Sequence, residues 1–300
     1  MLSKEAQEFN ELFKSIPVEP ADVPRDYVKA REINAARPQF PIPDGVSITQ
    51  IVINGIDGEV LRPARPNGRF IWYIHGGGLT TGAANERRDI TVYLADRYGY
   101  TVYASNYRLS PENKWPAHLE DCILFYEGLL EQGIDPHKLF FFGESAGGTL
   151  VLSTALKARD TGLPLPAGLA AFSPPTAEGT EFPSRLANIG TDYMLHDALS
   201  RPDQLISVTG TADPPESLMK DPYFAPYYAD YHDMPPIFLS ASDYEVLYDD
   251  SVLLYEKLKQ TGAEACLDVK HEMIHAWPAA GIMLPEAWDT ISKAIAFLEK

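Results

Sequence analysis

The chain has 300 residues, of which 45% are hydrophobic and 22% are charged, a composition typical of one or two globular domains with a sizeable buried core. The formal net charge is -17, which disfavours nucleic acid and membrane surfaces as partners. Two cysteines, no basic leader and no apolar run of membrane-spanning length predict a cytoplasmic protein without a disulfide framework.

The N-terminal quarter of the chain mixes regular and irregular patterns. Residues 1–15 predict a short amphipathic helix, because their apolar side chains fall on one helical face. Residues 16–45 are rich in proline and show little periodicity, so we expect irregular structure there. Residues 47–61 predict two strands joined by a glycine-containing turn.

From residue 70 onward, short apolar runs alternate with amphipathic helical patterns. Runs too short for helices, separated by such helices, predict an α/β protein whose mostly parallel sheet is covered on both faces. Together with the two preceding strands, the sheet is expected to have eight strands. The predicted strands are 70–74, 101–105, 139–142, 168–172, 237–240 and 266–270, and the predicted helices are 89–97, 119–130, 146–157, 251–259 and 286–298.

Residues 176–231 interrupt this alternation. The stretch is rich in Pro, Asp and Tyr and contains one predicted helical piece at 197–205. A long break inside a compact α/β domain is typical of a lid or a binding insertion. We therefore expect residues 1–45 and 176–231 to form a small, mainly helical cap over a core made of 46–175 and 232–300.

A serine between glycines follows the predicted strand 139–142. The segment GESAG at residues 143–147 matches the G-x-S-x-G nucleophile elbow, in which a tight strand-to-helix turn presents the serine. Such a turn needs neighbours with almost no side chain, and the following helix directs its positive end at the serine oxygen. Ser145 is therefore the candidate nucleophile.

A glycine-rich segment, HGGG at residues 75–78, follows the predicted strand 70–74. In acyl transfer, negative charge develops on the former carbonyl oxygen, and one main-chain N–H directed at it can lower the barrier by about 3 kcal/mol. A phosphate-binding loop would need a lysine at a set offset, which this segment lacks. The candidate donors are the N–H groups of Gly77, Gly78 and Ala146, supported by His75, Gly76, Gly143 and Gly147.

Several further short motifs accompany the serine turn and the glycine-rich segment. They are YRLSPE at 107–112, WPA at 115–117, ED at 120–121, DP at 135–136, SP at 173–174 and LYDD at 247–250. In this order, all these motifs resemble those of the bacterial hormone-sensitive-lipase-like carboxylesterases. The resemblance covers roughly residues 51–300, while 1–45 and 176–231 match only in type, as the places where this family carries its cap. It implies the α/β-hydrolase fold and an ester hydrolase, with Glu144 standing where the family more often has Asp.

The serine hydroxyl needs a base, normally an oriented histidine, which in this fold follows the serine and the acid along the chain. His275 lies after the last predicted strand, at the position of the family's histidine. His232 and His271 are the other late candidates.

Two carboxylates are candidates for the residue that orients this histidine. Asp243 and Glu245 both follow the predicted strand 237–240. The family pattern, laid on residues 245–250, places the acid at Glu245, and Asp243 is the alternative.

The segment HEMIH at residues 271–275 also satisfies the H-E-x-x-H zinc motif. That motif requires a helix, whereas this segment follows the predicted strand 266–270 and soon meets Pro278. No third ligand is evident either, so we expect neither a metal nor an organic cofactor.

These residues predict acyl transfer to water through a covalent acyl-enzyme, and the resemblance implies small esters with short to medium acyl chains as the substrates. The rival functions are an amidase or acyltransferase with the same triad, and a non-catalytic small-molecule receptor on the same fold. The sequence leaves open the natural substrate, the stereochemical preference and the oligomeric state, for which a homodimer rests on the resemblance alone. Four aromatic residues could line an acyl pocket or pack the cap against the core: Tyr223, Tyr227, Tyr228 and Trp277.

Overall fold

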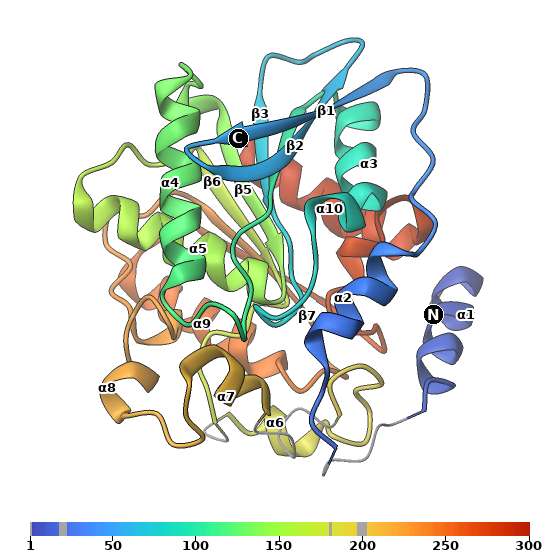
Figure 1. The fold of residues 1–300 in the computed structure, drawn as a ribbon, viewed down its shortest axis with the longest axis vertical. Coiled ribbons are helices and arrows are strands. Elements are labelled where there is room, and N and C mark those ends of the chain that lie inside the picture. The colour runs from blue at the N-terminus through green and yellow to red at the C-terminus, as the bar shows by residue number, and fades with distance from the viewer. Residues whose placement is uncertain (1, 18–22, 180–181, 197–202) are drawn as a thin grey trace.

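The computed structural model describes residues 2–17, 23–179, 182–196 and 203–300 (Figure 1). Its centre is an eight-stranded sheet in the order β1-β2-β4-β3-β5-β6-β7-β8. The β1–β2 and β2–β4 pairs are antiparallel, and all other neighbours are parallel, which confirms the predicted α/β class. The strands are β1 (Val46–Ile53), β2 (Ile56–Pro63), β3 (Phe70–Ile74), β4 (Thr101–Ser105), β5 (Leu139–Glu144), β6 (Gly168–Phe172), β7 (Ile237–Ser242) and β8 (Ala265–Lys270).

Helices cover both faces of this sheet, as the alternating pattern predicts. The packing of α4, α5 and α9 on one face and of α3 and α10 on the other explains why every residue of the central strand β5 is buried. The helices are α1 (Lys4–Lys14), α2 (Tyr27–Ala35), α3 (Arg88–Tyr98), α4 (Ala117–Glu131), α5 (Ala146–Thr161), α6 (Ser184–Ala187), α7 (Asp203–Thr209), α8 (Glu216–Met219), α9 (Tyr248–Thr261) and α10 (Pro285–Leu298). Short 3₁₀ helices are η1 (Ala84–Arg87), η2 (Pro136–Lys138), η4 (Pro226–Tyr228) and η5 (Trp277–Met283).

The expectation of irregular structure throughout residues 16–45 is wrong, because this region contains α2. Asp26 caps the helix by accepting a hydrogen bond from the N–H of Lys29 at 2.9 Å. Arg31 then forms an ion pair with Glu112 of the core at 2.7 Å. The helix depends on such contacts outside its own sequence, which has little apolar periodicity.

The segment between β6 and β7 contains only short helices in its described parts. Residues 197–202 of the helical piece predicted at 197–205 lie outside the described residues, and α7 begins at Asp203. In Figure 1, α6, α7 and α8 gather at one end of the molecule, with α2 nearby.

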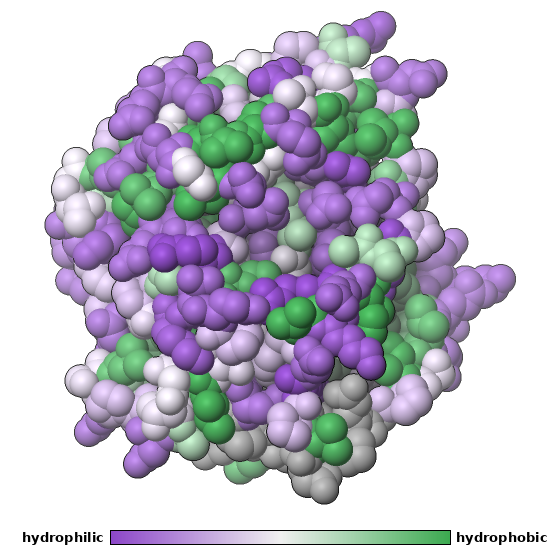
Figure 2. All heavy atoms as spheres, in the orientation of Figure 1, coloured by the Kyte–Doolittle hydropathy of each residue, from purple (hydrophilic) through white to green (hydrophobic). Residues whose placement is uncertain are grey.

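The face drawn in Figure 2 is largely polar, and neither cysteine forms a disulfide. Hydrophilic side chains predominate on the face drawn in Figure 2, with apolar ones interspersed. Cys122 is buried on α4 and Cys266 is half-buried on β8, and both are free thiols. In the described ranges, none of the helices has the length and hydropathy to cross a membrane.

The parallel strands bring their carboxyl ends to one edge of the sheet. The loops that follow β3, β5, β7 and β8 leave this edge. They carry the glycine-rich segment, the serine, the two candidate carboxylates and two of the late histidines, His271 and His275. In α/β proteins, ligands bind at this edge.

Candidate active site

Ser145 occupies a strained turn between β5 and α5. Its backbone angles are φ 53° and ψ −129°, in a region that residues other than glycine rarely adopt. The turn is held by a 2.8 Å hydrogen bond from the Ser145 N–H to the carbonyl of Phe172 on the neighbouring strand. The serine is thus presented at the carboxyl edge of the sheet.

The glycines around this serine are required by close backbone approach. A Cβ atom on Gly143 would lie 2.6 Å from the carbonyl oxygen of Gly147, and one on Gly147 would lie 2.1 Å from the carbonyl oxygen of Ile74. Both distances are shorter than real contacts allow, so any side chain here would displace the backbone.

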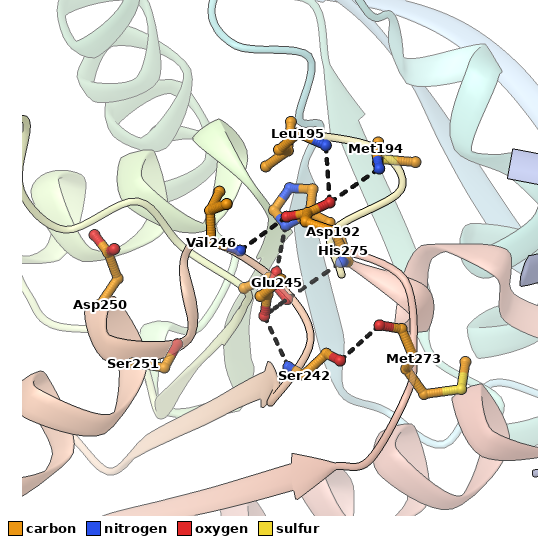
Figure 3. Close-up of polar contacts among 12 residues, drawn as sticks. Asp192, Met194, Leu195, Ser242, Glu245, Val246, Asp250, Ser251, Met273 and His275 are labelled. Atoms are coloured by element: carbon orange, nitrogen blue, oxygen red, sulfur yellow. Dashed lines mark hydrogen bonds and ion pairs between the residues drawn. The ribbon is translucent and has the colours of Figure 1, made fainter. Parts of the chain in front are cut away.

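His275 lies in the loop after β8 and contacts a carboxylate. Its Nδ1 is 2.5 Å from Oε2 of Glu245, and both side chains are buried (Figure 3). Burial lowers the pKa of His275, but the hydrogen bond and charge of Glu245 raise it, and the net shift is upward. The other ring nitrogen, Nε2, has no hydrogen-bond partner within the described ranges.

Glu245 is fixed on its second oxygen as well. Its Oε1 accepts hydrogen bonds from the hydroxyl of Ser173 at 2.9 Å and from the N–H of Ser242 at 2.8 Å. The Ser173 oxygen in turn accepts the N–H of Ala276 at 3.2 Å, so one hydroxyl joins the loops of Glu245 and His275. In the sequence, Ser173 is marked only as part of a short motif, because its bridging contact depends on three segments distant along the chain.

The alternative acid, Asp243, lies with a different histidine. Its Oδ2 is 2.8 Å from Nδ1 of His271, and its Oδ1 accepts the N–H of Glu272 at 3.1 Å. His271 is exposed, as is His232, whose ring contacts Asp230. The structure therefore brings only one of the late histidines, His275, to Glu245.

The H-E-x-x-H segment does not form the helix that a zinc site needs. It lies in the loop after β8, and Glu272 adopts a positive φ of 59°. His271 and His275 contact different carboxylates. Across the described ranges, no group of three or more His, Cys, Asp or Glu residues is arranged to hold a metal ion.

The glycine-rich segment curls beside the serine turn. Gly77 and Gly78 have φ values of 114° and 62°, which favour glycine. The N–H of Gly76 donates to Oε1 of Glu144 at 2.7 Å. No hydrogen bond within the described residues uses the N–H of Gly77, Gly78 or Ala146.

Glu144 anchors this segment through contacts with residues distant in the sequence. Besides Gly76, it accepts hydrogen bonds from Nε of Arg87 at 2.5 Å and from the hydroxyl of Tyr73 at 2.6 Å. The neighbouring His75 stacks on Tyr107 with ring centroids 4.3 Å apart, and burial lowers the pKa of His75 to about 4. A neutral His75 can donate its Nδ1 proton to the carbonyl of Gly76, 2.8 Å away.

One cavity of about 800 Å³ joins these elements. Ser145 and His275 both line it, although no hydrogen bond connects them, and so do the glycine-rich segment and Glu144. Of the four aromatic residues singled out in the sequence, Trp277 lines the cavity and the three tyrosines do not. Apolar lining comes from segments far apart in sequence: Phe9, Phe13, Met194, Leu195, Leu205 and Trp277.

Comparison with known proteins gives a consistent family assignment. A family model described as alpha/beta hydrolase fold matches residues 71–279. The chain is 32% identical over 297 residues to an acetyl-hydrolase of Streptomyces hygroscopicus, covering 99% of this chain and 95% of the relative. A solved esterase/lipase from an uncultured bacterium superposes with a TM-score of 0.88 at 30% identity, covering 99% and 98% of the two chains. A solved esterase of the bacterial hormone-sensitive lipase family has a TM-score of 0.85 at 27% identity, covering 99% of this chain and 98% of the other.

The fold, the matched family model and these relatives define the class of the protein as an α/β hydrolase. The chain belongs to the bacterial hormone-sensitive-lipase-like carboxylesterase family, and it is an ester hydrolase.

Proposed function

We propose that this enzyme hydrolyses small carboxylic esters with short to medium acyl chains through a covalent intermediate on Ser145. The observation that carries the proposal is the 2.5 Å contact of His275 with buried Glu245, in a cavity that Ser145 also lines. The acyl size agrees with the name of the acetyl-hydrolase relative and with a cavity of about 800 Å³.

In the first step, Oγ of Ser145 attacks the ester carbonyl carbon while Nε2 of His275 takes the hydroxyl proton. Glu245, bonded to Nδ1, keeps the proton of the neutral ring on that nitrogen and stabilises the imidazolium that forms. The serine and the histidine close on each other when substrate binds, as is common in hydrolases whose apo geometry is loose.

The negative charge of the tetrahedral intermediate falls on the former carbonyl oxygen. The N–H groups of Gly77, Gly78 and Ala146 are the proposed donors to this oxygen, since no other hydrogen bond within the described residues uses them. His275 then protonates the departing alcohol, which leaves the acyl group esterified to Ser145. A water molecule attacks this ester with His275 as base, releasing the acid and restoring the serine.

Residues 1–45 and 176–231 form one cap in this proposal. Two observations support this division. The hydroxyl of Tyr27 donates to Oδ2 of Asp203 at 3.0 Å, linking the two segments directly. Both segments also line the cavity, through Phe13 and Leu205 among others.

The direct test is turnover of p-nitrophenyl acetate, butyrate, octanoate and dodecanoate by the wild type and by Ser145→Ala. The variant should lose activity by about 10⁴-fold or more while unfolding at an unchanged urea concentration. A fluorophosphonate probe should label the wild type and leave the variant unlabelled. The matched control is Ser47→Ala, at an exposed serine on β1, which should keep wild-type rates. Ester turnover retained by Ser145→Ala would refute the proposal.

A further inference from the structure

Asp192 is a buried carboxylate in the segment between β6 and β7, and the mechanism above does not use it. Only 3% of its surface is exposed. Its Oδ2 accepts the N–H of Val246 at 2.8 Å, and its Oδ1 accepts the N–H groups of Met194 at 2.9 Å and Leu195 at 2.8 Å. Among the described residues, it forms no ion pair with a lysine or an arginine. A buried charge held only by neutral donors is costly unless something else compensates for it.

The three residues that Asp192 holds are all part of the candidate active site. Met194, Leu195 and Val246 line the cavity, and Val246 directly follows Glu245 (Figure 3). The carboxylate therefore joins one wall of the cavity to the loop that carries the proposed catalytic acid.

Neutral contacts fasten the same two loops beside Asp192. The side-chain amide of Asn188 donates to the carbonyl oxygens of Asp243 at 3.0 Å and Glu245 at 2.9 Å. The hydroxyl of Thr191 donates to the carbonyl of Tyr244 at 3.0 Å. Neutral side chains thus also tie these loops together, and among Asn188, Thr191 and Asp192 the last is the one that carries a negative charge.

That charge acts on His275. The charged groups that raise the pKa of His275 are Glu245 first, then Asp192, and then Glu144 beside the serine turn. The imidazolium formed during acyl transfer is therefore surrounded by carboxylates from three separate segments, of which Glu245 alone contacts the ring through a hydrogen bond.

We propose that Asp192 is a positioning residue of the active site, which holds the loop of Glu245 and supplies a second negative charge that favours the protonated state of His275. This inference rests on the proposed function, because it assigns His275 the role of base. It also explains why a charged side chain, rather than another amide or hydroxyl, stands among the neutral contacts between these loops.

The test compares the pH dependence of kcat/KM for p-nitrophenyl butyrate in the wild type, Asp192→Asn and Thr191→Val. The base must be neutral to accept a proton, so activity falls as the pH drops through the pKa of His275. Asp192→Asn removes one negative charge near His275 and so lowers its pKa. The acid limb, the part of the pH profile where kcat/KM falls with falling pH, should therefore move to lower pH by roughly half a pH unit or more. Thr191→Val removes a neutral contact between the same loops, and its acid limb should stay with that of the wild type.

A purely structural role would lower kcat or stability and leave the acid limb in place, so an unmoved limb in Asp192→Asn overturns the inference. If that variant does not fold, Asp192→Ser replaces it, because a serine hydroxyl can still accept from the N–H groups of Met194 and Leu195 but carries no charge. Its acid limb should also move to lower pH, and an unmoved limb in this variant overturns the inference equally. Fluorophosphonate labelling of Ser145 in the wild type is measured alongside, since its absence would count against the proposed function itself.

Discussion

The Nδ1 atom of His275 contacts Oε2 of Glu245 at 2.5 Å, while Asp243, which lies two residues before Glu245 in the chain, contacts His271. A carboxylate at Nδ1 holds the proton of a neutral imidazole on that nitrogen, so the lone pair remains on Nε2. Within the described ranges, Nε2 is also the ring atom without a hydrogen-bond partner. The pairing therefore leaves the basic nitrogen available, and it makes the two carboxylates experimentally distinguishable.

Exchanging each carboxylate for its amide separates their roles. Glu245→Gln should lower kcat/KM by about 10³- to 10⁴-fold, because the amide can no longer hold the correct tautomer or stabilise the imidazolium. Asp243→Asn, which removes only a surface contact with His271, should stay close to the wild type. Initial rates on p-nitrophenyl butyrate measure both effects. A larger loss in Asp243→Asn than in Glu245→Gln would reverse the assignment of the acid.

The acid side of the pH–rate profile should lie above the ordinary histidine value of 6.5. The structure raises the pKa of His275, and a base with a raised pKa becomes protonated, and so inactive, at a higher pH. The midpoint of the acid limb of kcat/KM in the wild type measures this shift. Glu245→Gln should move the midpoint to lower pH, because it removes the carboxylate that acts most strongly on the ring. A wild-type midpoint at or below 6.5 would contradict this prediction.

The strained backbone at Ser145 should lower stability. Its φ of 53° with ψ of −129° is accessible to glycine, and such strain in other residues costs about 1–3 kcal/mol. Ser145→Gly should therefore unfold with a free energy about 1 kcal/mol higher than the wild type, while losing activity. Ser145→Ala is the matched control, since alanine keeps the strain and should not gain stability. Urea denaturation of the three proteins measures the difference, and a glycine variant no more stable than the alanine variant would exclude stored strain.

The close approach at the elbow predicts a large cost for a single methyl group. In Gly147→Ala, the new Cβ would meet the carbonyl oxygens of Ile74 at 2.1 Å and His75 at 2.5 Å, so α5 must move away from the end of β3. We expect a loss of about 3 kcal/mol or more in the free energy of unfolding. Gly190→Ala, where nothing lies within 4 Å, should change stability by less than about 0.5 kcal/mol. Equal effects of the two substitutions would show that the turn tolerates expansion.

Local patterns predicted the strands, the main helices and the serine turn because each depends on neighbouring residues. The alternation of short apolar runs with amphipathic helices specified the α/β class, and the glycines around Ser145 marked a turn that only small residues permit. The helix α2 escaped prediction because its stability comes from the Asp26 cap and the ion pair of Arg31 with Glu112 rather than from periodicity.

Taken alone, the sequence determined the order of the elements, the position of the candidate nucleophile and two candidate carboxylates after β7, of which the family pattern favoured Glu245 over Asp243. Only the tertiary structure decided which carboxylate contacts His275, that Ser173 bridges two loops, that Glu144 holds the glycine-rich segment and that Asp192 is buried against the loop of Glu245. The physical reason is the separation of the partners: these contacts join residues up to 103 positions apart, and a side chain's neighbours at that range depend on how the strands align. A residue type and its spacing specify local backbone geometry, whereas pairing across loops is settled by the packing of the folded sheet.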